Sequence, residues 1–179
     1  MTVRVNKSPI NIREKLNELD YAQVPYDKMP IGSVIQTAYS QSTMNARITF
    51  ASGTPTEIHS SLRVPISLRR PNSVVLVTAL TGWRQDGTNG IAYILPQVST
   101  DGGSSFSLFN DYTGASNGEM FRNHSSMSYN FDTQTLSFMD WNTSGTDRIY
   151  SMFVQVTAGT MYIGDNQPRT NLIVQEIAQ

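Results

Sequence analysis

The 179-residue chain contains no cysteine and only three lysines, two histidines and two tryptophans. Without cysteine, disulfides, thiolate zinc sites and cysteine nucleophiles are all excluded. Thirteen basic against fourteen acidic residues give a net charge of −1, which provides no electrostatic footprint for nucleic acid or an anionic membrane. No apolar run approaches the roughly 20 residues that cross a bilayer, and the first residues lack a signal-peptide core. We therefore expect neither a nucleic-acid partner nor a membrane partner.

Charged residues make up 15% of the chain, whereas about 25% is typical, and neutral serine, threonine, asparagine and glutamine replace them. About a third of the residues are of the β-branched and aromatic types that favour strands. All three lysines lie within the first 28 residues, and residues 1–30 hold five basic and four acidic side chains. This distribution divides the chain into an N-terminal arm, residues 1–30, and a β-rich body, residues 31–179.

The arm contains one convincing helix, predicted over about residues 9–20. Ser8 is a suitable N-cap, Pro9 is tolerated in a first turn, and apolar side chains recur at spacings of four and three. A helix of about 18 Å is marginal in water by itself, so its apolar stripe must pack against something. It either caps its own β body or docks on another subunit or a larger assembly. The residues assigned to docking are Ile12, Arg13, Lys15, Leu16 and Leu19.

From Gly32 onward the hydrophobic pattern alternates with a period of two, which is typical of half-buried strands. Turn signals rich in glycine, asparagine and aspartate separate these runs, and residues 148–164 resemble a hairpin. The sequence predicts an all-β fold, an antiparallel β-sandwich or jelly roll with a short N-terminal α-helical arm. Strands are expected near residues 33–39, 45–50, 56–66, 73–80, 91–98, 105–109, 127–131, 134–140, 148–156, 160–163 and 171–178.

Two of the expected strands, residues 149–156 and 171–178, have apolar side chains on both faces. One face would fill the sandwich, and the other would be exposed unless a partner covers it. This pattern favours an oligomer, although a central strand in a large monomeric sandwich would look the same. The predicted oligomer-interface residues are Ile149, Phe153, Ile173 and Ile177.

Catalytic patterns are weak. Residues 114–118 satisfy G-x-S-x-G, but no buried strand precedes them and no helix follows, so Ser116 is expected in a plain turn. His59 and His124 lie 65 positions apart without acidic residues at ligand spacing, and Arg69-Arg70-Pro71 is typical of a solvated turn. The sequence therefore predicts no catalytic residue, no metal site, no cofactor and no enzymatic activity.

Aromatic residues beside polar loop residues form a second candidate site. Trp83, Tyr112 and Trp141 lie in or near expected loops that contain asparagine, aspartate and serine. Such side chains can stack on a sugar face while neighbouring polar groups bind its hydroxyls. The alternative is that these aromatic residues pack the rim of the sandwich.

Eight body segments carry a resemblance to a known family: Gly32-Ser-Val-Ile-Gln36, Leu62-Arg-Val-Pro-Ile66, Ser73-Val-Val-Leu-Val77, Ser99-Thr-Asp-Gly-Gly103, Leu136-Ser-Phe-Met-Asp140, Tyr150 to Val156, Gly159-Thr-Met-Tyr-Ile163 and Leu172-Ile-Val-Gln-Glu-Ile-Ala178. In this order along the chain they resemble the small β-sandwich domains of tailed-phage structural proteins, found in fibres and virion appendages, especially of marine phages. The segment Arg4 to Leu19 also resembles an N-terminal segment of structural proteins from cyanophage-like viruses. The resemblance implies a virion protein made in the host cytoplasm, a homotrimer attached by its N-terminal arm to other phage structural proteins of the capsid or tail.

The arm is short for a long fibre. About 30 residues precede the body, and fully extended they reach at most roughly 100 Å. The sequence therefore favours a short surface appendage, as capsid decoration, head fibre or tail accessory, over a complete host-reaching fibre. The alternative function is a host-surface glycan-binding module of a tail fibre, which would use the aromatic loops for receptor recognition.

Overall fold

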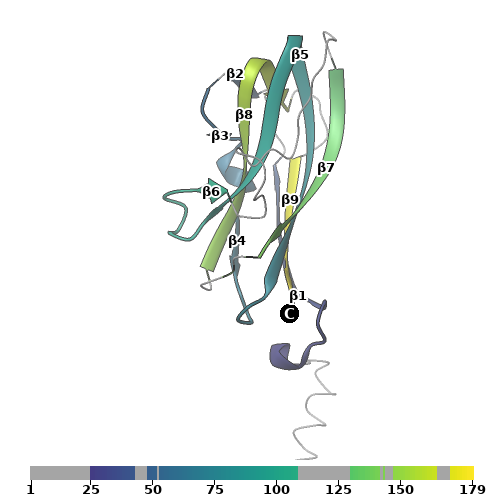
Figure 1. Cartoon of the computed structure of the whole chain (residues 1–179), viewed down its shortest axis with the longest axis vertical. Coiled ribbons are helices and arrows are strands. Elements are labelled where there is room, and N and C mark those ends of the chain that lie inside the picture. The colour runs from purple at the N-terminus through teal and green to yellow at the C-terminus, as the bar shows by residue number, and fades with distance from the viewer. Residues whose placement is uncertain are drawn as a thin grey trace, which may run out of the picture.

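In the computed structural model, the described residues are 25–42, 48–51, 53–108, 130–141, 143, 147–164 and 170–179. They form an antiparallel β-sandwich of jelly-roll type, which confirms the predicted fold class. In chain order the elements are η1 (Tyr26–Lys28), β1 (Val34–Ser42), β2 (Ile48–Ala51), β3 (Thr56–Glu57), η2 (Ser60–Leu62), β4 (Val64–Ser67), β5 (Val74–Ser99), β6 (Ser107–Leu108), β7 (Asn130–Asp140), β8 (Asp147–Ile163) and β9 (Thr170–Ile177) (Figure 1).

The long strand β5 belongs to both layers of the sandwich. Its first part, residues 74–85, pairs with β7, and residues 74–80 also pair with β9, whose other neighbour is β1. Its last part, residues 91–99, pairs with β8 and, near its end, with β6. Figure 1 shows these two parts descending from a bend at the top of the view. The first layer is therefore β1–β9–β5–β7, and the second contains β8, the end of β5 and the short strands.

Strand β8 follows β5 around this bend, which corrects the predicted hairpin over residues 148–164. Its two halves pair with β5 and not with each other: Val156 lies opposite Ala92, and Thr160 lies opposite Asp86. Gly159 has a φ of 77°, a left-handed conformation that glycine adopts without steric cost, so the strand bends there without ending. The turn expected at residues 86–90 is likewise a register shift within β5.

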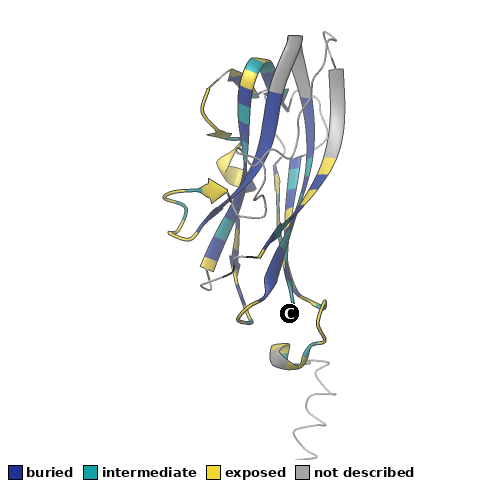
Figure 2. Cartoon of the chain, viewed as in Figure 1, coloured by how far each residue is buried: buried dark blue, intermediate teal, exposed yellow. Residues whose placement is uncertain are grey.

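The predicted alternation places the core correctly, even where an element differs. Residues 56–66 form β3, η2 and β4 and not one strand, yet their apolar side chains still face inward. Figure 2 shows buried residues recurring along the strands that face each other. The alternating residues confirmed as buried are Leu62, Val64, Ile66, Leu68, Leu136, Phe138, Tyr150, Met152, Val154 and Val156.

Polar contacts join the two layers along the β1 edge. Ser40 Oγ donates a hydrogen bond to the carbonyl oxygen of Leu62 at 2.8 Å. Gln36 Nε2 donates to the carbonyl oxygen of Ser67 at 2.6 Å. Because both acceptors belong to η2 and β4, these side chains close the sandwich on the side of β1 that pairs with no strand among the described residues.

A buried carboxylate fixes the turn between β4 and β5. Glu176 is fully buried, and its Oε1 accepts hydrogen bonds from the backbone N–H groups of Arg69 and Arg70, each at 3.0 Å. Ser73 Oγ donates to the same oxygen at 2.7 Å, and Gln36 Nε2 donates to Oε2 at 2.6 Å. These donors replace the water that the carboxylate loses on burial. They hold β1, β9 and the turn together.

The segment before β1 is tied to the end of the chain. Gly32 N donates to Ala178 O at 2.8 Å, and Ala178 N donates to Ser33 O at 2.9 Å. Arg70 Nη1 donates to Met29 O at 3.3 Å. The body therefore begins beside its own C-terminal strand, at the lower end in Figure 1. The boundary predicted near residue 30 falls in this segment, and the helix predicted over residues 9–20 lies outside the described residues.

The buried carboxylate predicts a stability effect. Glu176→Gln replaces one acceptor oxygen with a donor group, so at least one buried N–H or O–H group loses its acceptor. We expect the free energy of unfolding, measured by urea denaturation, to fall by about 2–3 kcal/mol. Asp147→Asn is the control, because the Asp147 carboxylate accepts its hydrogen bond from Ser67 at the surface. A loss no larger than that of the control would contradict the role assigned to Glu176.

Candidate functional site

The described outward side chains of the first layer form a surface without charged groups, which we call the neutral face. Alternation in β5, β7 and β9 buries one set of side chains and directs the other set outward. Hydrogen bonds run between neighbouring strands across this surface, from Gln175 Nε2 to Thr37 Oγ1 at 3.4 Å and between the Thr78 and Ser137 hydroxyls at 3.3 Å. The face consists of Thr37, Tyr39, Gln41, Leu76, Thr78, Leu80, Thr135, Ser137, Met139, Asn171, Ile173 and Gln175.

An aromatic side chain and a hollow lie side by side on the neutral face. Tyr39 is 76% exposed, and its cross-strand partner Ile173 is 38% exposed. The hollow has a volume of about 210 Å³ and is mainly apolar. The face therefore presents both a protruding ring and a depression of side-chain size. The lining residues are Thr37, Tyr39, Ser40, Gln41, Asn171 and Ile173.

The four residues predicted for an oligomer interface are divided between the two layers. Ile173 and Ile177 lie on β9 and face outward from the first layer, and Ile173 belongs to the neutral face. Ile149 and Phe153 lie on β8 and are half-buried. The ring of Phe106 lies 5.3 Å from that of Phe153, so the chain itself covers part of the β8 surface. The structure does not bring these four residues into one patch.

An ionic cluster holds the turn before β6 against β8. Arg63 makes two 2.8 Å hydrogen bonds to the Glu57 carboxylate, and its guanidinium lies 4.9 Å from the centre of the Phe106 ring. Arg63 Nη1 also donates to Gly103 O at 3.3 Å, and Ser151 Oγ donates to Glu57 Oε1 at 2.6 Å. The hydrogen bonds from Arg63, assisted by the one from Ser151, lower the pKa of Glu57.

The same turn uses the carboxylate of Asp101 internally. Asp101 Oδ1 accepts hydrogen bonds from Ser99 Oγ at 2.6 Å and from the backbone N–H groups of Ser104 and Ser105 at 3.1 and 3.0 Å. Ser105 Oγ donates to Oδ2 at 2.6 Å. The bonds from Ser105 and Ser99 hold the pKa of Asp101 well below its usual value. This carboxylate therefore shapes a turn.

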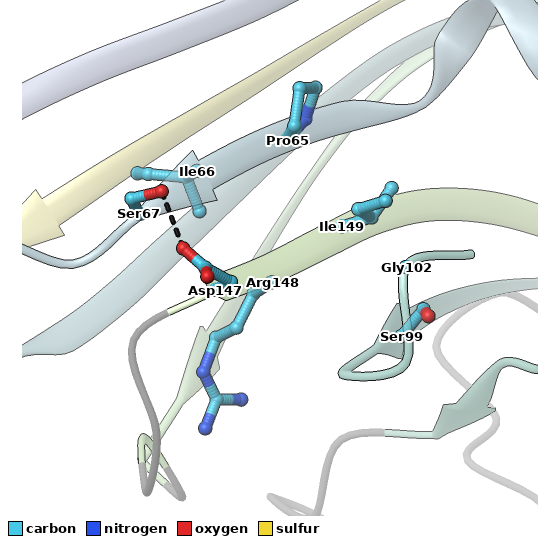
Figure 3. A pocket seen from close by; sticks show the side chains of 8 residues that line it. All are labelled: Pro65, Ile66, Ser67, Ser99, Gly102, Asp147, Arg148 and Ile149. Carbon is cyan, nitrogen blue, oxygen red and sulfur yellow. Dashed lines mark hydrogen bonds between the residues drawn. The ribbon is translucent and has the colours of Figure 1, made fainter.

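A second hollow, of about 200 Å³, lies near the start of β8 (Figure 3). At its rim Ser67 Oγ donates to Asp147 Oδ1 at 2.6 Å, and Arg148 points away from Pro65 and Gly102. The guanidinium instead pairs with the buried Asp140 carboxylate, as described below. The lining residues contain no histidine and no pair of carboxylates. The remaining lining residues are Ile66, Ser99 and Ile149.

Beneath this hollow, a buried ion pair connects the layers. Arg148 Nη1 lies 2.9 Å from Asp140 Oδ2, and Tyr150 donates its hydroxyl to the same oxygen at 2.8 Å. Burial, together with the Asp140 charge, raises the pKa of Tyr150. Asp140 ends β7 and Arg148 is the second residue of β8, so the pair joins the two layers at this end of the sandwich.

The aromatic candidates for sugar stacking do not form one site. Trp83 is 2% exposed and belongs to the core, so the proposed sugar-stacking role for Trp83 is wrong: β5 continues through this position and turns its indole inward. Trp141 follows β7 and is 53% exposed, whereas Tyr112 lies outside the described residues.

Other singled-out residues are placed as follows. His59 is the N-cap of η2, where its Nδ1 accepts a hydrogen bond from Ser61 N at 3.1 Å.

Within the described parts of the chain, no three His, Cys, Asp or Glu residues are grouped as metal ligands. In those parts no helix has the length and apolar character to cross a membrane. The remaining candidate residues lie outside the described part of the chain: His124, Ser116, Ile12, Arg13, Lys15, Leu16 and Leu19.

Sequence reasoning missed the internal anion site of the β4–β5 turn. Arg69 and Arg70 were assigned to a solvated turn, but their backbone N–H groups bind Glu176. The alternation along β9 could have revealed this site, because it places Glu176 on the same buried side of the strand as Leu172 and Val174. A lone acidic residue on an apolar strand face indicates a buried carboxylate with its own donors.

Among solved structures, the chain is similar to Eiger TNF from S. frugiperda. The TM-score is 0.41 at 10% sequence identity, and the match covers 82% of this chain and 95% of the Eiger chain. The likeness concerns the β-sandwich fold alone. No protein-family model matches the sequence, and no curated protein matches it.

The ionic cluster predicts how stability depends on pH. The folded-state pKa of Glu57 lies below its ordinary value of 4.5, so its stabilising contribution is present above pH 4.5 and is lost as the pH falls through the folded pKa. We expect the stability difference between wild type and Glu57→Gln to shrink over this window in urea unfolding experiments. Arg63→Gln should show the same trend. A difference independent of pH would contradict the assignment.

Proposed function

We propose that this chain is a non-enzymatic structural protein of a phage virion, a short trimeric surface appendage that serves as capsid decoration, head fibre or tail accessory. The main support for this proposal is the neutral face. It exposes Tyr39 and Ile173 on a rigid sheet and contains no charged side chain among its described residues. Interface cores are depleted of charge and enriched in aromatic residues, whereas a permanently solvated surface normally carries charges of both signs.

The described ionic clusters support a structural role because their groups are engaged in holding the fold. Glu176 fixes the β4–β5 turn, Asp140 connects the two layers, and Glu57 fixes the position of Arg63. A general acid or base needs a titratable group within reach of a bound substrate. These carboxylates instead accept hydrogen bonds from the surrounding protein, so they favour a building block over an enzyme.

The beginning of the body supports attachment through the arm. Gly32 and Ser33 are hydrogen-bonded to Ala178, so the arm joins the body at the end of the sandwich where β9 also ends. The bend of β5 lies at the opposite end (Figure 1). We propose that the end that carries the arm faces the particle and that the bend faces outward. In a trimer, three arms would strengthen individually weak contacts through avidity.

Removal of the arm tests attachment. Deletion of residues 1–20 is expected to leave a folded oligomer that no longer joins particles, as measured by the copies retained on purified virions. Leu16→Asp should lower this copy number about tenfold or more, because it places a charge in the predicted apolar stripe. Asn17→Asp is the matched control outside the stripe. Normal incorporation of the deletion variant would contradict anchoring by the arm.

Trp141 supports the second candidate function, recognition of a host-surface glycan. Trp141 directly follows β7 and is 53% exposed, so part of its indole surface can contact a sugar ring. We expect a glycan array to show binding by the wild-type chain that Trp141→Ala abolishes. Tyr26→Ala, which removes another exposed ring, should preserve the binding. Absence of binding to host polysaccharides would favour the purely architectural function.

A further inference from the structure

We infer that the neutral face is a contact surface between copies of this chain, in which Tyr39 of one copy occupies the hollow beside Ile173 on the next. This inference rests on the proposed function only in that the appendage is an oligomer. It specifies which surface associates, which partner covers it and which side chain is central to the contact.

The lack of charge on the described residues of the neutral face favours a second copy of the chain as its partner. In a symmetric ring of identical copies, residues near the symmetry axis lie beside their own counterparts, so a charge there would meet like charges. The described residues of the neutral face avoid this repulsion because their polar groups are hydroxyls and amides. A strongly acidic or basic partner would find no opposite charge there. An identical neutral surface therefore suits it better than a charged one.

The shape of the face points to the same partner. Tyr39 protrudes with 76% exposure directly beside a hollow of about 210 Å³. A ring cannot fill the hollow that it borders without leaving its own position, but the same ring on a neighbouring copy can enter it. Tyrosine is enriched among residues that dominate interface energies, because it buries a large rigid area and keeps one polar group for hydrogen bonding.

The face is large enough to form the centre of a contact. Its residues span five positions along each of four strands, which corresponds to roughly 17 by 19 Å, or about 320 Å² on each copy. Two copies would bury about 650 Å² there, below the roughly 1,000 Å² of the smallest specific interfaces, so surface around the face must also take part. Ring closure would bury further surface where each copy contacts two neighbours.

The outer side of the second layer is a poorer candidate. By alternation Tyr93 and Leu95 of β5 face outward from that layer, yet they are only 7% and 1% exposed because the chain covers them. The neighbouring part of β8 carries the turn held by Arg63 and Glu57. In contrast, the outward side of the first layer leaves Tyr39 and Ile173 in solvent.

The test uses the full chain and a pair of matched substitutions. Ile173 on the neutral face and Leu108 on β6 are both 38% exposed, so Ile173→Asp and Leu108→Asp make the same change at equal exposure. Sedimentation velocity should show an oligomer for wild type and Leu108→Asp. Ile173→Asp and Tyr39→Glu should weaken association ~30-fold or more. A monomeric wild type, or equal behaviour of the two matched variants, would overturn the inference.

A second measurement remains informative if a charged variant fails to fold. Because the chain has no cysteine, single-cysteine variants react with maleimide at one position only. Gln41→Cys, at the hollow, should be protected from maleimide-polyethylene glycol in the oligomer and reactive after dilution to monomer. Thr157→Cys, exposed on β8, should react equally in both states. Equal reactivity of Gln41→Cys in the two states would contradict the assigned contact.

These outcomes separate the contact surface from the proposed function. A wild-type monomer that still joins virions through its arm would overturn the contact and leave arm-mediated attachment intact. An oligomer that depends on Ile173 and Tyr39 but never appears on particles would establish the contact and contradict the virion role.

Discussion

The fold depends on the hydrogen bonds that surround the Glu176 carboxylate. A buried charge is tolerable only when donors replace its water, and here the donors come from β1 and from the turn that separates β4 from β5. Through Gln36 the first strand is fixed to the last, and through Arg69 and Arg70 the turn is fixed to both. The orientation of the first layer, and therefore of the neutral face, follows from this anchor.

The two layers differ in how much of their outer surface the chain itself covers. In the second layer the chain covers its own apolar residues, and the Arg63–Glu57 pair with the Phe106 ring secures that cover. The first layer has no comparable cover over Tyr39 and Ile173. Its outward polar groups instead bond to one another across strands, as Thr37 and Gln175 do. One layer is complete within the monomer, and the other is suited to contact with a partner.

The sequence predicted which side chains are buried better than how the strands are connected, for physical reasons. Period-two alternation reports which side of a strand is buried, so Leu62, Val64 and Ile66 were assigned correctly although η2 interrupts their strand. Alternation does not report which strands share a layer, and Ile149 and Ile173 were therefore predicted together although they lie on different layers. A glycine such as Gly159 indicates a bend without distinguishing a hairpin from a strand that turns a corner.

The neutral face suggests a physical reason for the low charge of the chain. Hydroxyl and amide groups exchange water for protein partners at little net cost, whereas a charge must be fully paired to leave water. A surface built from threonine, glutamine and asparagine around Tyr39 and Ile173 is therefore compatible with both the free and the assembled state. Charged side chains would favour the free state, and a fully apolar face would favour uncontrolled aggregation. The surplus of neutral polar residues fits a protein that must fold first and assemble afterwards.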